Sequence, residues 1–318
     1  MTSYHLPVMA EMVVQLFSRR PDGCIVDATA GTGGHAEALL LSDDVMHVVG
    51  IDRDSSVLDI CRVRLERFGD RIKLIQGRFS QIESLLGEIG IGSSQAAGIL
   101  LDLGLNSLQI DTPSRGFSYM AEGPLDMRMD ATRGITASDL VNGATEDELA
   151  ELFRANGEYQ NARRVARAIV ASRPLHSTAQ LVGVIDRAVP ASAHKRKGHA
   201  AKRFFQAMRV YVNEEQAELS AVLDASMRLL ADKGYLITIS YHSGEDSMIK
   251  AFMRHAETGG CQCPPQLPCR CGAVSSGRMI FRGARKPTCD EIDRNPRAKS
   301  AKLRAFERVI SKKEGRCP

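Results

Sequence analysis

The sequence predicts an α/β fold in which a parallel sheet carries helices on both faces. Two observations indicate this fold: short apolar runs alternate with helical patterns along residues 1–109, and a glycine-rich turn follows the first apolar run. A third observation indicates a second domain, because residues 110–205 hold helical patterns and no convincing strand.

The predicted strands are short runs rich in Val, Ile and Leu, as strands buried on both faces usually are. They lie at residues 24–27, 47–52, 72–75, 97–102 and 234–240. Around them, apolar residues recur at helical spacing at residues 11–17, 34–41, 55–68 and 243–254. We expect Ser55 to cap the third of these helices, and the weakly periodic tail beyond residue 260 to be partly loop.

The interrupting segment has its own series of helical patterns. They lie at residues 136–141, 146–154, 161–172 and 179–188, and an amphipathic stretch at 200–230 leads back to the sheet. We therefore predict a discontinuous α/β domain formed by residues 1–109 and 206–318. An all-helical insertion domain at residues 110–205 interrupts it.

The composition is typical of a globular protein with a large core. Of 318 residues, 43% are hydrophobic and 25% charged. No apolar stretch reaches the roughly 18 residues that a spanning helix needs, and no signal-peptide pattern opens the chain, so we expect a cytoplasmic protein. The net charge of +4 is uneven, because residues 278–313 carry 12 Lys and Arg against 4 Asp and Glu. Such basic surface suits a phosphate-bearing partner, and a solvated charged face is the alternative.

The glycine-rich turn points to a bound nucleotide-like cofactor. Gly31, Gly33 and Ala36 match the loose dinucleotide pattern, and Asp52 lies where a ribose-binding acid belongs, so a nicotinamide enzyme is one hypothesis. Asp27 favours another, because a carboxylate beside the turn repels a pyrophosphate but attracts the sulfonium and ammonium of S-adenosyl-L-methionine. We therefore expect S-adenosyl-L-methionine, with a turn that binds nothing as the remaining alternative.

A polar loop follows the fourth predicted strand, at the sheet edge where open α/β folds bind ligands. It contains Asp102, Asn106, Ser107 and Gln109. Acceptors there would draw the lone pair of an exocyclic base amine toward the methyl donor and take up its proton. The alternative is a loop whose polar side chains satisfy backbone groups. His242, after the last predicted strand, either orients the base or is a hydrogen-bonded structural histidine.

Several motifs are long enough to be specific, above all Pro-Leu-Asp-Met-Arg-Met-Asp at residues 124–130. Others lie at residues 5–8, 27–35, 50–54, 101–104, 107–109, 115–118, 157–158, 167–170, 205–209, 212–215, 239–243, 245–246 and 295–303. With these motifs, the chain resembles the bacterial 16S ribosomal RNA (cytosine-N4) methyltransferase family over nearly its whole length.

The resemblance implies a Rossmann-like S-adenosyl-L-methionine-dependent methyltransferase core with an inserted all-helical domain. It also implies methylation of the N4 amine of a decoding-centre cytidine in 16S rRNA of the small ribosomal subunit. The donor would be held by residues that match the family's: Gly33, Gly34, His35, Asp52, Phe79, Asp102 and Gln109. The glycines would admit the methionine part, Asp52 the ribose hydroxyls, and Phe79 would cover the adenine. The candidate catalytic residues are Asp102, Asn106, Ser107 and His242.

The chain departs from the family pattern near the chemistry. Asn106 and Leu108 stand where the family usually has Ser and Pro, which leaves the target-base pocket less determined. Gly244 and Ser247 stand where it usually has Leu and Arg, and the missing arginine would weaken a phosphate contact. Tyr159 replaces a residue that is commonly acidic.

Basic residues of the insert are candidate RNA contacts. Arg163, Arg164 and Arg167 share a helical face, with surface solubility as the alternative, and residues 194–203 form a denser basic cluster. Phe204 and Phe205 beside that cluster are expected to be core residues.

The sequence does not decide between a monomer and a homodimer. The alternative function is that of a ribosome-assembly factor without catalytic activity.

Four cysteines in the tail raise the question of a metal. Cys261, Cys263, Cys269 and Cys271 offer four thiolates, but their spacing is not the usual Cys-x2-Cys knuckle and methyl transfer needs no metal. We therefore expect no metal and a reduced, proline-rich loop, with zinc as the alternative. Cys24 and Cys61 lie in apolar runs and are expected to be small core residues.

Overall fold

The computed structural model describes residues 6–190, 199–264 and 270–310, and the chain divides into two compact units. We call Met1–Gly104 with Glu218–Pro318 the sheet unit, and Leu105–Ala217 the helical unit. The helical unit contains the whole of the predicted insert and extends beyond it at both ends. The division into a catalytic domain and an insertion domain stays a prediction.

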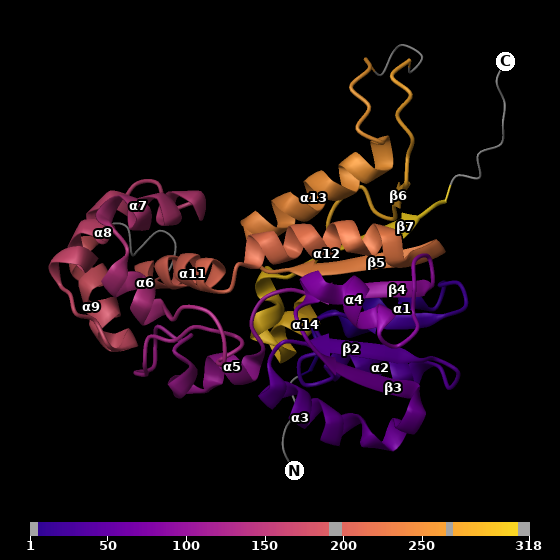
Figure 1. Ribbon diagram of the computed structural model, residues 1–318, viewed down its shortest axis with the longest axis horizontal. Helices are drawn as coiled ribbons and strands as arrows, with labels where there is room; N and C mark the ends of the chain where they lie inside the picture. The colour runs from indigo at the N-terminus through magenta and orange to yellow at the C-terminus, as the bar shows by residue number, and fades with distance from the viewer. Residues whose placement is uncertain (1–5, 191–198, 265–269, 311–318) are drawn as a thin grey trace. The chain divides into compact units, whose positions relative to one another are not determined.

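A seven-stranded sheet forms the centre of the sheet unit, in the order β3-β2-β1-β4-β5-β7-β6 (Figure 1). Its strands are β1 (Cys24–Asp27), β2 (Val48–Asp52), β3 (Ile72–Gln76), β4 (Ala96–Asp102), β5 (Leu230–Ser240), β6 (Gly277–Met279) and β7 (Lys302–Arg308). The first five are parallel, whereas β7 pairs antiparallel with both β5 and β6. This is a Rossmann-like arrangement, in which the chain order reverses between β1 and β4 and ligands bind at the carboxyl ends of the strands.

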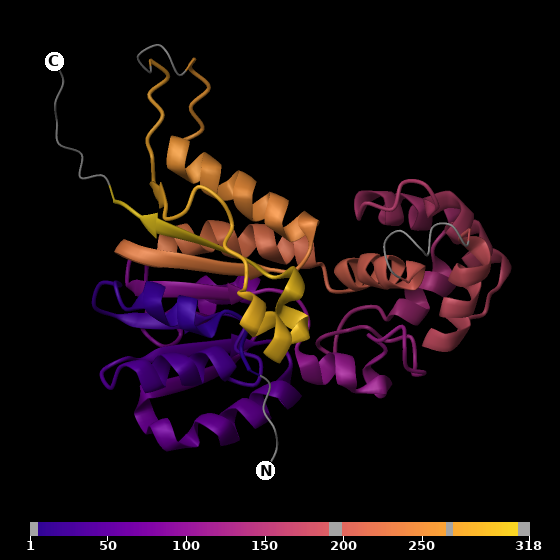
Figure 2. The same ribbon diagram turned by 180° about the vertical axis from the view of Figure 1, so that it is seen from behind.

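Helices cover both faces of the sheet, so neighbouring residues of a strand are both buried. Ile25 packs with α1 (Ala10–Phe17), α2 (Gly34–Ser42) and α3 (Ser55–Leu65), and Val26 packs on the opposite face. That face carries α4 (Ile82–Gly87), α12 (Glu215–Leu229) and α13 (Ser243–Thr258), the last two lying side by side (Figure 2). Shorter helices complete the unit: η1 (Glu66–Arg71), η2 (Phe79–Gln81), α14 (Cys289–Arg294) and η4 (Pro296–Ser300).

Two sequence-based expectations need correction. The cap of α3 is Asp54, not Ser55, because its carboxylate accepts from the backbone N–H of Ser56 at 3.1 Å. Cys61 is buried as expected, but Cys24 is only partly buried. The tail is partly loop, as expected, and it also contains β7, which runs between β5 and β6 within the sheet.

The helical unit is built from α5 (Ser107–Asp111), η3 (Pro113–Arg115), α6 (Ala137–Gly143), α7 (Glu146–Ala155), α8 (Ala162–Ala171), α9 (Thr178–Ala188) and α11 (Ala200–Val212). Thr136, Thr145 and Ser177 begin α6, α7 and α9 with capping boxes, a local signal that fixes where each helix starts. Phe204 and Phe205 are buried as expected, and the Phe204 ring meets Phe153 edge-on with centroids 4.8 Å apart. None of the helices in the described ranges is long and apolar enough to span a membrane.

The predicted amphipathic stretch at 200–230 is two helices rather than one. The chain turns between α11 and α12, where Glu214 has a left-handed φ of 53°. Within the described part of the helical unit, backbone β-pairing is confined to one isolated bridge between Pro124 and Ser177.

Candidate active site

The glycine turn between β1 and α2 is held open by its backbone. Gly31 and Gly33 have φ values of 53° and 82°, in the left-handed region that favours glycine. The N–H of Gly31 donates to Asp52 Oδ2 at 2.9 Å, and that of Gly33 donates to the Ala30 carbonyl at 2.8 Å. A Cβ on Gly33 would lie 2.9 Å from the Cys61 sulfur, so no larger residue fits without displacing α3. The turn therefore presents bare backbone at the N-terminus of α2.

Asp27 lies buried beneath this turn at the end of β1. Its Oδ1 accepts from the Thr29 N–H at 3.2 Å, whereas its Oδ2 has no hydrogen-bond partner among the described residues. Burial raises the pKa of Asp27 to about 6, although the nearby His35 acts in the opposite direction. A buried carboxylate oxygen without a partner is unfavourable, so a cation placed against it would be stabilised.

Asp102 connects β4, α2 and the end of β5. Its N–H donates to Thr29 Oγ1 at 2.7 Å, and its Oδ1 accepts from the Tyr241 hydroxyl at 2.8 Å. Its Oδ2 lies 3.4 Å from His35 Nε2, which is an ionic contact rather than a short hydrogen bond. The side chain of Asp102 is 23% exposed, so the carboxylate is held on two sides and still open to a ligand.

Asp102 raises the pKa of its two neighbours, Tyr241 and His35. Burial raises the pKa of Tyr241 well above its usual value, and the Asp102 carboxylate adds to this shift, so the hydroxyl stays a donor. Burial by itself lowers the pKa of His35, but contact with Asp102 outweighs burial and the net shift is upward.

Tyr241 and Thr29 are contacts of Asp102 that sequence reasoning missed. Asp102 pairs with Ile239 in the β4–β5 register, which places Tyr241 just beyond the same sheet edge. The residue that the sequence indicates is the next one, His242. His242 caps α13, with Nδ1 accepting from the Glu245 N–H at 3.4 Å and Nε2 3.0 Å from a Glu245 carboxylate oxygen. These contacts are those of a structural histidine, and a catalytic role for it stays a prediction.

The remaining donor-site candidates of the sheet unit lie at the carboxyl ends of its strands. Asp52 ends β2, and its two oxygens accept from the N–H groups of Gly31 and Asp54. Phe79 begins η2 after β3 and packs partly buried against the core, and Gly34 opens α2. Topology therefore brings Gly33, Gly34, His35, Asp52, Phe79 and Asp102 to one edge of the sheet.

Asn106, Ser107 and Gln109 belong to the helical unit, where they form the first turn of α5. The Asn106 side chain accepts from the Leu108 N–H at 2.9 Å, and the Asn106 N–H donates to Gln109 Oε1 at 3.2 Å. This arrangement depends on one departure from the family pattern. A proline at position 108 has no N–H, so the bond to Asn106 exists because residue 108 is leucine.

Comparison with known proteins identifies the family. The sequence model of the MraW methylase family matches residues 2–309. The chain belongs to this family. It is 40% identical to the ribosomal RNA small subunit methyltransferase H of Heliobacterium modesticaldum, over 97% of this chain and 100% of that one. Proteins of the same name from Salinispora tropica and Thermobifida fusca are each 43% identical, over 96% of this chain and 84% and 93% of theirs.

The cofactor of this MraW methylase is S-adenosyl-L-methionine, as the sequence predicts. The hypothesis of a nicotinamide enzyme is therefore wrong. The residues at the glycine turn fit the cofactor. The unpartnered Asp27 oxygen suits its ammonium group, and the bare backbone at Gly33 and Gly34 leaves room for its methionine part.

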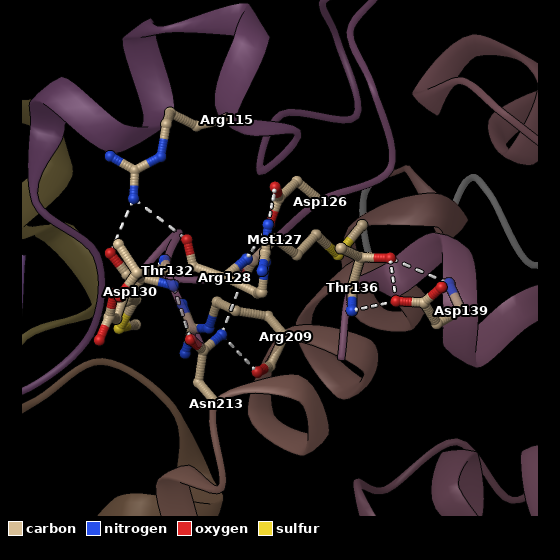
Figure 3. Close-up of polar contacts among 11 residues, drawn as sticks. Arg115, Asp126, Met127, Arg128, Asp130, Thr132, Thr136, Asp139, Arg209 and Asn213 are labelled. Carbon is tan, nitrogen blue, oxygen red and sulfur yellow. Dashed lines mark hydrogen bonds and ion pairs between the residues drawn. The ribbon is translucent and has the colours of Figure 1, made fainter. Parts of the chain in front are cut away.

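The most specific family motif, at residues 124–130, forms a cluster of hydrogen bonds and ion pairs within the helical unit (Figure 3). Asp126 holds the Arg128 guanidinium through both carboxylate oxygens, at 2.8 and 2.9 Å. Arg115 donates to the backbone carbonyls of Arg128 and Met129 at 3.1 and 2.8 Å. The Arg128 side chain is therefore paired within the helical unit.

Asn213 connects this cluster to α11 by hydrogen bonds. Its side-chain nitrogen donates to the carbonyls of Met127 and Arg209 at 2.7 and 2.9 Å, and its oxygen accepts from the Met129 N–H at 2.8 Å (Figure 3). Asn213 is only 5% exposed, so water cannot replace these bonds.

We expect Asn213→Ala to lower the free energy of unfolding by about 2–4 kcal/mol, because it leaves buried backbone groups without partners. Urea unfolding measures this change. Asn156→Ala is the control, since Asn156 makes a single side-chain bond, to the Leu152 carbonyl, and is partly exposed. Equal losses in the two variants would contradict the structural role of Asn213.

The basic residues predicted to contact RNA are partly paired with acids. Arg163 contacts Glu146 and Asp147, and Arg167 contacts Glu146, all at the exposed surface. The predicted role of this face in binding RNA stays a prediction. Lys195, Arg196, Lys197 and Cys269 lie outside the described residues.

Proposed function

We propose that this protein methylates the N4 amine of a decoding-centre cytidine in 16S rRNA, within the small ribosomal subunit. The names of its relatives support ribosomal RNA of the small subunit as the substrate. The observation that carries the chemistry is the Asp102 carboxylate, held by Tyr241 and His35 at the sheet edge beside the glycine turn.

A cytosine amine is a poor nucleophile because its lone pair is delocalised into the ring. When bound, S-adenosyl-L-methionine supplies the methyl group as a sulfonium electrophile. Asp102 accepts a hydrogen bond from the N4 amine, which favours the pyramidal geometry of attack. It takes up the proton as the carbon–nitrogen bond forms and the methyl–sulfur bond breaks, with S-adenosyl-L-homocysteine as the leaving group. Tyr241 holds the carboxylate in position through its hydroxyl. The Asn106–Ser107 turn is the second group that we place near the amine.

The other residues of the sheet edge hold the donor in this proposal. Asp27 attracts its positive charge, Gly33 and Gly34 border its methionine part, and Asp52 accepts from its ribose hydroxyls. Phe79 covers the adenine and Gln109 contacts the donor from α5. Besides the base Asp102, the enzyme contributes orientation of the amine against the methyl group and exclusion of water.

Transfer of a labelled methyl group to small subunits lacking the modification tests the proposal. We expect one methyl group per subunit, recovered as N4-methylated cytidine when the rRNA nucleosides are analysed by mass spectrometry. Subunits from cells that contain the enzyme are the control and should accept little label. Subunit binding without methyl transfer would indicate an assembly factor, and label at another atom would contradict N4 as the acceptor.

The pKa of Asp27 predicts how donor binding depends on pH. His35, Asp52 and Asp102 face Asp27, and burial places its pKa at about 6. As the pH rises through 6, the carboxylate ionises and attracts the cationic donor, so affinity should rise about tenfold between pH 5 and pH 7.

Calorimetry with S-adenosyl-L-methionine at several pH values measures this dependence. Asp27→Asn should weaken binding at pH 7 about tenfold and flatten the profile, because no carboxylate forms. Asp59→Asn, at an exposed carboxylate on α3, should leave the profile unchanged. A steep profile that persists in Asp27→Asn would assign the dependence to another group, such as His35.

A further inference from the structure

Three cysteine sulfurs meet in the loop that joins α13 to β6. The Sγ atoms of Cys261, Cys263 and Cys271 all lie within 4.8 Å of one another. Two of these residues follow α13 and the third precedes β6, on the two arms of chain that extend side by side from the sheet (Figures 1 and 2). The cluster is therefore assembled from two arms, and the Cys-x2-Cys spacing of a single knuckle does not apply to it.

The base of this loop is fixed by backbone contacts. Gly259 ends α13 with a φ of 61°, and a Cβ there would lie 2.4–2.6 Å from the backbone of Val274 on the other arm. The Ser276 N–H donates to the Ala256 carbonyl at 2.8 Å, and the Cys261 N–H donates to the Thr258 carbonyl at 3.1 Å. Glycine at 259 thus lets the two arms approach closely, which brings the cysteines together.

Ordinary explanations for clustered cysteines do not fit this loop. A cysteine buried as a small apolar residue is enclosed, as Cys61 is, but Cys261 and Cys263 are partly exposed and Cys271 is exposed. None of these three residues is in a disulfide. A cluster of thiols at the surface is chemically suited to a metal that prefers sulfur.

We propose that Cys261, Cys263 and Cys271 bind one zinc ion. Zinc–sulfur bonds of about 2.3 Å in a tetrahedron hold the sulfurs roughly 3.8 Å apart, which the cluster can reach with small shifts. Each thiol loses its proton on binding, and a fourth ligand, water or another side chain, completes the coordination.

The position of the cluster indicates a structural role for this zinc. The helix α13 starts after the carboxyl end of β5, where Tyr241 contacts Asp102, and runs back along the sheet to its other edge. The cysteines therefore lie away from the proposed chemistry, and the ion would join the two arms of the loop. We expect its removal to leave donor binding unchanged.

Zinc content of the whole protein, purified without chelators, tests the proposal. We expect about one zinc per chain in the wild type and a loss of zinc in Cys263→Ser and Cys271→Ser. Cys289→Ser is the matched control, because Cys289 is an exposed cysteine of the same unit at the start of α14, outside the cluster. Circular dichroism and calorimetric donor binding confirm that each variant is folded.

Two further measurements examine the ligands themselves. Cobalt substitution should give sulfur-to-metal charge-transfer bands in the wild type and in Cys289→Ser, but weakened bands in Cys263→Ser. Alkylation of Cys261, Cys263 and Cys271, followed by mass spectrometry, should be slow with zinc and fast after chelation. Equal alkylation rates with and without zinc, or zinc retained in full by Cys263→Ser, would overturn the proposal.

Discussion

Asp102→Asn should lower kcat for methyl transfer by about 10²–10⁴-fold, with a smaller effect on donor affinity. Asparagine has the shape of aspartate and still accepts from Tyr241, but it carries no charge and cannot take up the proton of the cytosine amine. Single-turnover methyl transfer to small subunits measures the rate, and calorimetry measures donor binding.

Two variants show whether this loss is specific to the proposed base. Asp59→Asn, at an exposed carboxylate of the same unit, should keep the wild-type rate. Tyr241→Phe removes the hydroxyl that positions the Asp102 carboxylate and should lower kcat by about tenfold, with KM little changed. A wild-type rate in Asp102→Asn would transfer the role of base to Ser107 or His242.

Asp246→Asn should lower the free energy of unfolding by about 3–5 kcal/mol. The Asp246 carboxylate receives Arg304 Nε at one oxygen and Lys302 Nζ at the other, both at 2.8 Å. Asp246 and Arg304 are each only 9% exposed, so the substitution leaves a buried guanidinium without its counter-charge. Urea unfolding at pH 7 measures the loss.

The same ion pairs predict a loss of stability in acid. Burial opposes ionisation of Asp246, but hydrogen bonds from Arg304 and Lys302 outweigh it and lower its pKa. The stabilisation is therefore complete above the unfolded pKa of about 3.9 and is lost as the pH falls through the lower folded pKa. Glu83→Gln is the control, because its pair with Arg228 is exposed and contributes less than about 1 kcal/mol. Similar losses in both variants would contradict the argument.

The sequence predicted five strands and missed β6 and β7, and the predicted strands differ from β7 in how burial is achieved. The strands β1 to β5 are buried by apolar side chains, which local pattern reveals. The strand β7 carries Arg304 and Glu307 at buried positions, and they are tolerated because Asp246 and Arg278 pair with them. Those partners are distant in the chain, so no local pattern predicts this strand.

The candidate site divides in a similar way. Gly33, Asp52 and Asp102 follow strand ends, and their positions in the sequence were enough to place them at one edge. Tyr241 was missed because its contact with Asp102 depends on the register of β4 against β5. The pairing of Asn106 with Leu108 likewise needed the geometry of α5, although both departures were visible in the sequence.

The place of β7 in the sheet has a consequence for how the chain is made. Because β7 lies between β5 and β6, the outer edge of β5 has no strand beside it until residues 302–308 have been synthesised. Between the synthesis of β5 and that of β7, a nascent chain thus carries an open, aggregation-prone edge. The final stretch of the polypeptide, which holds none of the proposed catalytic groups, is what closes that edge.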